Sequence, residues 1–199
     1  MKIIGITGTS GAGKTTVCNI IEKQYNAKRI DADKIAKELS KPGTEYFKEI
    51  VEYFGTDILN VGVAPQGDPK INRKKLADIV FNNKSKREIL NQITEKHVVK
   101  KINEEIEELS KTEKLIILDV PLLFESGLDK KCNITIGVIA KENLKIQRIC
   151  KRDGIDEKLA KQRIDALKSD EFLKENCTHI ITNEGDIEEI KKQIDLILK

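Results

Sequence analysis

Residues 8–15 read GTSGAGKT and fit the phosphate-loop pattern G-x-x-x-x-G-K-[ST] in full. Glycines in such a loop let several backbone N–H groups turn inward around a phosphate chain, and a helix that begins at the loop adds the positive end of its dipole. Lys14 can reach the β and γ phosphates of a nucleotide, and the Thr15 hydroxyl can ligate a bridging magnesium ion. The alternative is a glycine-rich turn without a ligand, which the strand and helix expected on either side disfavour.

Three carboxylates follow predicted strands and could face the same crevice. Asp119 closes the apolar run LIILD, and Asp31 and Asp33 follow a short strand. In open α/β sheets, ligands bind beyond the carboxyl ends of the strands. Asp119 can therefore hold magnesium, and a carboxylate of the DAD segment can orient an acceptor hydroxyl and accept its proton. The alternatives are a strand-end aspartate that caps a turn and an acidic first turn of a helix.

A third cluster is basic. Arg148 and Arg152 are spaced i and i+4 on one predicted helix, and Arg163 lies on the next. Guanidinium groups can stabilise the charge that spreads over the equatorial oxygens of a transferring phosphoryl group. The turn around Gly154 would let the two helices form a lid that brings this charge to the site. The alternative is an ordinary solvated helix face.

Short apolar strands that alternate with helices must position these residues. The predicted strands are 1–7, 27–30, 114–120, 134–140 and 179–183, and the predicted helices are 14–24, 34–39, 73–81, 85–109, 142–152, 156–168 and 186–198. Ser85 and Glu88 resemble a capping box, and Asp186 is a natural N-cap. Residues 41–72 are the most irregular stretch, in which VGVAPQGDP (61–69) predicts a surface loop or hairpin. The alternation predicts a parallel sheet covered by helices on both faces.

The composition excludes several other classes of protein. The chain has 199 residues, with 36 Lys+Arg against 33 Asp+Glu, a net charge of +3, and 39% hydrophobic residues, which suits one globular domain. Because the charges are interspersed, nothing indicates nucleic-acid or membrane binding. The four cysteines are scattered along the chain, which does not favour disulfides. Cys177 and His179 are too few ligands for a zinc site. Without an apolar span or signal core, we expect a cytoplasmic protein.

Taken together, the motifs resemble those of the dephospho-coenzyme A kinase family, within the nucleoside-monophosphate-kinase-like group of phosphate-loop kinases. The resemblance rests on GITGTSGAGKTTV, DADKIAKEL, PGTEYFKEIVEYFG, INRKKLADIVF, DVPLLFESGL, QRICKRDG, the later Arg163-Ile164 pair and THIITNEG. These blocks follow the family order over nearly the whole chain. DVPLLFE, which begins at Asp119, is much more specific to this family than the phosphate-loop motif.

The resemblance implies transfer of the γ-phosphoryl group of ATP to the ribose 3′-hydroxyl of dephospho-CoA, the last step of coenzyme A synthesis, with Mg²⁺ as cofactor. The implied catalytic residues are Lys14, Asp33, Arg148 and Arg152. Implied ATP-binding residues are Gly8, Ser10, Gly11, Ala12, Gly13, Lys14, Thr15, Thr16, Arg148, Asn183 and Gly185, the last two bordering the adenine. Implied acceptor-binding residues are Asp31, Asp33, Phe81, His97, Asp119, Leu122, Phe124 and Arg163. Thr15 and Asp119 are the implied metal ligands.

The family resemblance also implies an architecture. It predicts a three-layer α/β fold with a five-stranded parallel sheet, formed by about 1–40, 110–142 and 168–199. A helical acceptor-binding region would span about 41–109, and a small lid about 143–167. The chain departs from the family where it has His97-Val98 in place of the usual His-Pro. A proline there would break the helix, so the local shape of the acceptor region should differ.

Two other readings stay open from the sequence. One is a kinase of the same architecture that acts on another nucleotide or nucleoside, because a family resemblance constrains the fold more strongly than the identity of the acceptor. The other is a GTP-dependent switch without a small-molecule acceptor. The guanine-reading pattern N-K-x-D is missing, since Asn83-Lys84 is followed by Ser85-Lys86, which disfavours the switch. The sequence indicates neither an oligomeric state nor a nucleotide preference beyond ATP.

Overall fold

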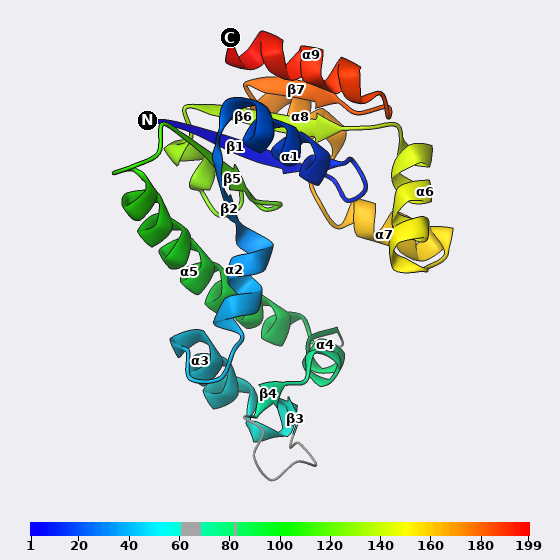
Figure 1. Cartoon of the computed structure of the whole chain (residues 1–199). Helices are drawn as coiled ribbons and strands as arrows, with labels where there is room; N and C mark the ends of the chain where they lie inside the picture. The colour runs from blue at the N-terminus through cyan, green and yellow to red at the C-terminus, as the bar shows by residue number, and fades with distance from the viewer. Residues whose placement is uncertain (61–68, 82) are drawn as a thin grey trace. The chain divides into compact units, whose positions relative to one another are not determined.

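The computed structural model describes residues 1–60, 69–81 and 83–199, which divide into two compact units (Figure 1). Unit 1 comprises Met1–Asp31 and Ile106–Lys199, and unit 2 comprises Ala32–Glu105. Helical unit 2 begins earlier in the chain than the predicted acceptor-binding region. The assignment of that region and of the lid to their functions stays a prediction. The loop predicted at 61–69 lies, apart from Pro69, outside the described residues.

Unit 1 is built on a five-stranded parallel sheet, which confirms the predicted fold class. Its strands in spatial order are β2 (Lys28–Asp31), β5 (Leu115–Asp119), β1 (Lys2–Gly8), β6 (Ile134–Ile139) and β7 (His179–Thr182). The apolar runs of β1, β5 and β6 are almost wholly buried, as expected for a sheet covered on both faces. In register, Asp119 of β5 lies beside Ile6 of β1 and Asp31 of β2. The carboxyl ends of β2 and β5 therefore meet beside the segment that follows β1.

Helices cover both faces of this sheet (Figure 1). They are α1 (Lys14–Tyr25), α6 (Glu142–Asp153), α7 (Glu157–Asp165), α8 (Asp170–Asn176) and α9 (Ile187–Leu198), and a short 3₁₀ helix spans Leu128–Lys131. On one face, α1 and α9 share a core with Ile4 and Ile6. On the other face, a Cβ added to Gly137 would touch Leu173 of α8. The pair α6 and α7 packs around its own small apolar cluster.

Unit 2 is mainly helical. Its elements are α2 (Ala32–Leu39), α3 (Glu45–Phe54), a 3₁₀ helix (Thr56–Ile58), α4 (Arg73–Phe81) and α5 (Lys84–Leu109), with the short antiparallel pair β3 (Leu59–Asn60) and β4 (Lys70–Ile71). A separate apolar core holds these elements together through Tyr46, Ile50, Ile58, Leu76 and Ile93. Unit 2 thus has an apolar cluster of its own.

Two helices were missed by the sequence prediction. The stretch 41–72 contains α3, where the Thr44 side chain accepts a hydrogen bond from the Phe47 N–H at 3.1 Å. The predicted helix 156–168 ends at Asp165, and α8 follows, with Ser169 accepting from the Phe172 N–H at 3.1 Å. In both places an N-cap residue satisfies a backbone donor at the start of the helix. Because turn-forming residues flank both segments, the sequence pattern did not predict these helix starts.

The N-terminal caps of two other helices differ in how well they match the caps expected from the sequence. The expected capping box of Ser85 and Glu88 is wrong, because α5 starts earlier and the Asn83 side chain accepts from the Lys86 N–H at 3.0 Å. The expected cap of α9 is confirmed, since Asp186 accepts from the Glu188 N–H at 2.9 Å. The helix α5 also runs unbroken through Val98, where a proline would remove a backbone donor.

Candidate active site

The phosphate loop, residues 8–16, joins β1 to α1 in the way its motif predicts. Gly11 and Gly13 have φ angles of 78° and 89°, in the left-handed region that favours glycine. A Cβ on Gly13 would lie 2.0 Å from the Asn183 Nδ2 atom, so a larger residue has no room there. Gly13 is thus fixed both by its backbone conformation and by a close neighbour from after β7.

Two side chains from distant segments brace this loop through its carbonyl oxygens. Asn183 is 4% exposed, and its Nδ2 donates to the Ala12 carbonyl at 2.9 Å. Arg148 of α6 donates through Nη1 to the Gly11 carbonyl at 3.2 Å, and through Nη2 to the Asn183 carbonyl at 3.2 Å. Because these bonds occupy loop carbonyls, they hold the loop without using the N–H groups that a phosphate chain needs.

A buried carboxylate lies beside the loop. Asp119 is 2% exposed, and its two oxygens accept from the Lys14 ammonium and the Arg29 guanidinium. Arg29 also lies 3.6 Å from the Asp31 carboxylate on the same strand. The two cations compensate the buried charge of Asp119, which would otherwise be costly. Arg29 was missed from the sequence, and only its position two residues before the strand-end Asp31 could have suggested it.

A second ion pair, with a buried lysine, also lies beside the loop. Lys145 of α6 is 5% exposed, and its Nζ lies 2.9 Å from Asp170 Oδ2. The other oxygen of Asp170 accepts from the Thr9 hydroxyl at 3.3 Å. A Cβ on Gly11 would lie 2.6 Å from the Lys145 carbonyl oxygen, which shows how closely α6 approaches the loop. Nothing in the sequence indicates this pair, because Lys145, Asp170 and Thr9 lie in segments far apart in the chain.

The predicted arginine cluster is divided by the structure. Arg148 reaches the phosphate loop, whereas Arg152 donates to its neighbour Asp153 at 2.7 and 2.9 Å. Arg163 of α7 also donates to Asp153, so this carboxylate joins the two helices. The two arginines hold the pKa of Asp153 below its usual value, chiefly through the hydrogen bonds from Arg152. A role for Arg152 and Arg163 in catalysis stays a prediction.

The other predicted residues of unit 1 border the same edge of the sheet or the segment after β5. Leu122 is 49% exposed. The ring of Phe124 packs edge-on against Phe172 of α8, with 5.4 Å between the ring centres. Gly185, just after β7, has a φ of 114°. The remaining loop residues of the prediction, Gly8, Ser10, Thr15 and Thr16, lie in the loop or the first turn of α1, and Thr15 is exposed.

Three predicted acceptor residues belong to unit 2. Asp33 is exposed in the first turn of α2. Phe81, at the end of α4, is 80% exposed. His97 of α5 lies 2.6 Å from a Glu49 oxygen through Nε2, and its ring meets that of Tyr46 edge-on. Hydrogen bonds from His97 and Lys96 lower the pKa of Glu49. His97 thus has a structural contact within unit 2, and a contact to substrate stays a prediction.

The site offers hard oxygen ligands, and three of the four cysteines have raised pKa values. Burial raises the pKa of Cys18 to about 11, of Cys132 to about 12 and of Cys177 to about 11, so these thiols stay protonated near neutral pH. Within the part of the chain that the structure describes, no group of three His, Cys, Asp or Glu residues could hold a metal ion. The Thr15 hydroxyl and the Asp119 carboxylate are the donor types that suit magnesium shared with nucleotide phosphates.

A profile of the dephospho-CoA kinase family matches residues 2–189, and so covers the phosphate loop, Asp119, Arg148 and Asn183 together. The chain belongs to the dephospho-CoA kinase family. It is 39% identical to a dephospho-CoA kinase from Fusobacterium nucleatum over 196 residues, 98% of this chain and 96% of that relative. The family assignment thus extends over both units.

Solved structures agree with the dephospho-CoA kinase assignment. The fold matches that of a dephospho-CoA kinase from Campylobacter jejuni with a TM-score of 0.67 and 30% identity, over 99% of this chain and 96% of that one. It also matches TT1252 from Thermus thermophilus with a TM-score of 0.81 and 25% identity, over 99% and 96% of the two chains. Among the described residues, no helix is both long and apolar enough to span a membrane.

Proposed function

We propose roles for the residues described above in the reaction of this family, the ATP-dependent phosphorylation of dephospho-CoA to coenzyme A. The protein is a kinase that transfers the γ-phosphoryl group to the ribose 3′-hydroxyl in the last step of coenzyme A synthesis. The observation that supports the residue roles is the braced phosphate loop with Lys14 and Asp119 beside it. No feature of the described residues favours a different acceptor, and the guanine-reading motif of a switch is missing from the sequence.

The phosphate loop binds the nucleotide in this proposal. Its N–H groups and the start of α1 surround the phosphates, and Lys14 transfers from Asp119 to the phosphate oxygens when ATP arrives. Arg148 already lies at the loop and stabilises charge on the transferred group. Asn183 and Gly185 border the adenine, as the family resemblance implies. Arg152 and Arg163, on a lid formed by about 143–167, would add charge as the site closes.

Magnesium fits the donor set of the loop. Mg²⁺ is usually held by one or two protein oxygens, by waters and by substrate phosphates. Thr15 and Asp119 would be those protein ligands. When bound, the ion would neutralise charge that develops between the β and γ phosphates. Release of Lys14 from Asp119 would leave an oxygen of this carboxylate for the ion or for a water bound to it.

Asp33 acts on the hydroxyl group of the acceptor in this proposal. As the carboxylate of the DAD motif, it orients the 3′-hydroxyl and accepts its proton. Its exposure at the start of α2 leaves it accessible to a substrate. Asp31, Phe81, His97, Leu122 and Phe124 are further contacts that the resemblance implies for the acceptor. The partners are thus two small molecules, ATP and dephospho-CoA, in a protein that we expect in the cytoplasm.

The test is ATP consumption with magnesium and a panel of acceptors, with each product identified by mass. Dephospho-CoA is compared with AMP, CMP, UMP and 4′-phosphopantetheine. We expect turnover with dephospho-CoA alone, giving a product phosphorylated at the 3′ position. Turnover with another nucleotide would overturn the acceptor assignment, and hydrolysis of ATP without any acceptor would favour an ATPase or a switch.

The role of Asp33 has its own test, the substitution Asp33→Asn. We expect kcat to fall by about 10²- to 10⁴-fold, because a positioned general base contributes about that much. The KM for ATP should change little, since the lost interaction acts in the transition state. Asp57→Asn, in an exposed 3₁₀ turn of the same unit, is the matched control. Wild-type turnover by Asp33→Asn would remove the proposed role.

A further inference from the structure

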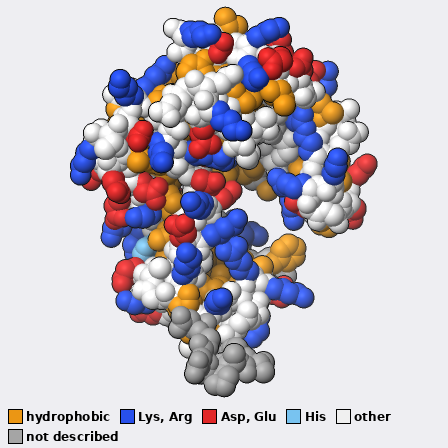
Figure 2. Space-filling model, viewed as in Figure 1, with side chains coloured by type: hydrophobic (Ala, Val, Ile, Leu, Met, Phe, Trp, Pro, Cys, Tyr) orange, Lys and Arg blue, Asp and Glu red, His pale blue; other side chains and the backbone are white. Residues whose placement is uncertain are grey.

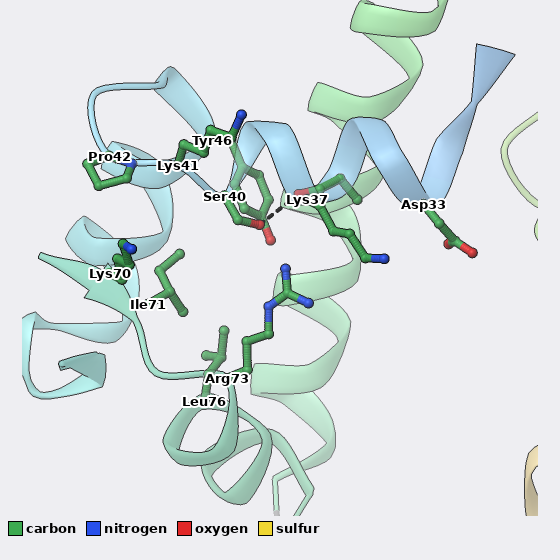
Figure 3. Close-up of a pocket in the computed structure, with 11 residues that line it drawn as sticks. Asp33, Lys37, Ser40, Lys41, Pro42, Tyr46, Lys70, Ile71, Arg73 and Leu76 are labelled. Carbon is green, nitrogen blue, oxygen red and sulfur yellow. Dashed lines mark hydrogen bonds between the residues drawn. The ribbon is translucent and has the colours of Figure 1, made fainter. Parts of the chain in front are cut away.

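A pocket within unit 2 lies outside the residues assigned so far, apart from Asp33 at one end of it. It has a volume of about 600 Å³ and is lined by α2, the start of α3, β4 and α4 (Figure 3). Four of its lining residues are cations: Lys37, Lys41, Lys70 and Arg73. Within the described part of the chain, none of these four forms an ion pair. Figure 2 shows Lys and Arg side chains gathered on this face of unit 2, over α2 and α4.

The helix α4 adds to this positive charge. Its first turn holds Arg73, Lys74 and Lys75 and no acidic residue. Cations at a helix N-terminus are unfavourable, because they face the positive end of the helix dipole. The Asn72 side chain caps the helix by accepting from the Lys74 and Lys75 N–H groups at 3.1 Å each. A bound anion beside Arg73 would offset this repulsion.

The acidic and basic residues of the pocket lie at different positions along α2. Asp33 and Lys37 are one turn apart on α2, so they share one face of that helix at a separation of about 6 Å along its axis. Figure 3 shows Asp33 at one end of the helix, with Lys37 and the Arg73 guanidinium pointing into the space further along. Ile71, Leu76 and Pro42 supply an apolar wall. A carboxylate that attracts a hydroxyl is thus followed, one turn later, by cations that attract an anion.

We propose that this pocket binds the diphosphate of the acceptor, with Arg73 and Lys37 as the residues that contact it. The inference rests on the proposed function, in which Asp33 holds the 3′-hydroxyl of dephospho-CoA. The diphosphate is attached to the 5′ carbon of the same ribose, so it lies about one helical turn from that hydroxyl. A guanidinium matches phosphate oxygens through paired hydrogen bonds, and the ammonium of Lys37 adds a second charge. The apolar wall would then contact the pantetheine arm.

The decisive experiment compares two acceptors that share the hydroxyl, of which only dephospho-CoA carries the 5′ diphosphate and its pantetheine arm. Steady-state rates are measured with dephospho-CoA and with adenosine, at saturating ATP and magnesium, for the wild type, Arg73→Ala and Lys37→Ala. Arg87→Ala is the matched control, because Arg87 is an exposed arginine of unit 2 that does not line the pocket. Arg73 is itself exposed and lies at the unfavourable end of the α4 dipole, so its removal should not lower the melting temperature. Arg73→Lys keeps the charge and removes the paired hydrogen bonds.

We expect Arg73→Ala to lower kcat/KM for dephospho-CoA by about 10- to 100-fold, the loss typical of one charged hydrogen bond. The KM for ATP and the kcat/KM for adenosine should stay within about twofold of the wild type, a margin below the effect of one such bond. Lys37→Ala should act in the same direction, and Arg73→Lys should fall between the wild type and Arg73→Ala.

Three results would overturn the proposal, and they are distinguishable. If Arg73→Ala and Arg87→Ala have equal rates with dephospho-CoA, the pocket does not bind the acceptor, although the proposed function stands. If adenosine loses as much as dephospho-CoA, Arg73 acts on something other than the diphosphate. If the wild type itself does not phosphorylate dephospho-CoA, the proposed function fails, and the inference fails with it.

Discussion

The cations of the two units are held in different ways. Around the phosphate loop of unit 1, Lys14, Arg29, Lys145 and Arg148 all bond to protein groups, two of them to the buried Asp119. In the pocket of unit 2, the four lining cations form no ion pair with any described residue, and the cavity between them is open. The loop is thus shaped before a nucleotide binds, whereas the cations of the pocket are not paired with any described carboxylate.

This difference fits the functions proposed for the phosphate loop and for the pocket of unit 2. A phosphate loop has to present N–H groups in a fixed arrangement, and preorganised donors stabilise a transition state without reorganisation at the moment of reaction. Within unit 1, the loop is held in place by Asn183, Arg148 and the Lys145–Asp170 pair. An acceptor subsite has to capture a flexible substrate, for which exposed charge on a short, separately packed unit is sufficient.

The largest expected effect comes from two glycines that share a backbone conformation and differ in their surroundings. Gly13 has a φ of 89° and a Cβ there would lie 2.0 Å from Asn183, whereas Gly43 has a φ of 88° and nothing within 4 Å. Gly13→Ala should lower the free energy of unfolding by about 3 to 5 kcal/mol, from strain together with overpacking. Gly43→Ala should cost only the strain, about 1 to 2 kcal/mol.

Denaturant unfolding of both variants measures this pair of effects. ATP affinity, measured on the folded protein, should also fall in Gly13→Ala and stay at the wild-type value in Gly43→Ala. Equal losses of stability would mean that the phosphate loop is no more tightly packed than the turn at Gly43, and the contrast between the units would not hold.

A smaller loss is expected when a brace of the loop is removed. Asp170→Ala leaves the buried Lys145 without its carboxylate and removes the acceptor of the Thr9 hydroxyl. We expect the free energy of unfolding to fall by about 3 kcal/mol, because an unpaired buried charge is costly. Glu104→Ala breaks the exposed Lys101–Glu104 pair of unit 2 and should cost less than about 0.5 kcal/mol. Thermal and denaturant unfolding distinguish the two, and similar losses would show that Asp170 braces nothing.

The smallest expected effect concerns the link between α1 and α9. Tyr25 donates its hydroxyl proton to Asp195, and burial together with this carboxylate raises the pKa of Tyr25 to about 12. A raised pKa means that the contribution to stability is fully present below pH 10, the ordinary value, and is lost as the pH rises towards 12. Tyr25→Phe should cost about 1 kcal/mol or less at pH 8.

The pH dependence makes this small effect measurable. The stability difference between the wild type and Tyr25→Phe should shrink between pH 10 and pH 12, as unfolding is followed across that range. A difference that stays constant over this interval would show that the phenol hydroxyl does not link the two helices in solution.

The sequence predicted the parallel sheet and the position of the phosphate loop between β1 and α1 because the signals there are local. The phosphate loop is one contiguous motif, and buried strands such as 115–119 are short apolar runs with a polar residue at the end. The helix α4 was predicted at its observed bounds, 73–81. Asn183 was expected near the adenine from family resemblance, and its bond to Ala12 is a detail that only the packed structure shows.

The rest depends on contacts between distant segments. Arg29, Lys145 and Asp170 lie in three different elements, and each acquires its partner only when the sheet assembles. The helix α3 was hidden because Pro42, Gly43 and Gly55 flank it, although its cap Thr44 is a normal start signal. Arg73 and Lys37, 36 positions apart in sequence, reveal a shared role only once unit 2 folds around one pocket.

The central claim is that separate cations serve the two substrates, and one binding experiment tests it. Dissociation constants for ATP with magnesium and for dephospho-CoA are measured by calorimetry on the wild type, Lys14→Met and Arg73→Ala. We predict that Lys14→Met weakens ATP binding by at least about tenfold and leaves dephospho-CoA within about twofold, and that Arg73→Ala does the reverse. Variants that weaken both ligands equally, or that leave their own ligand unchanged, would contradict the account.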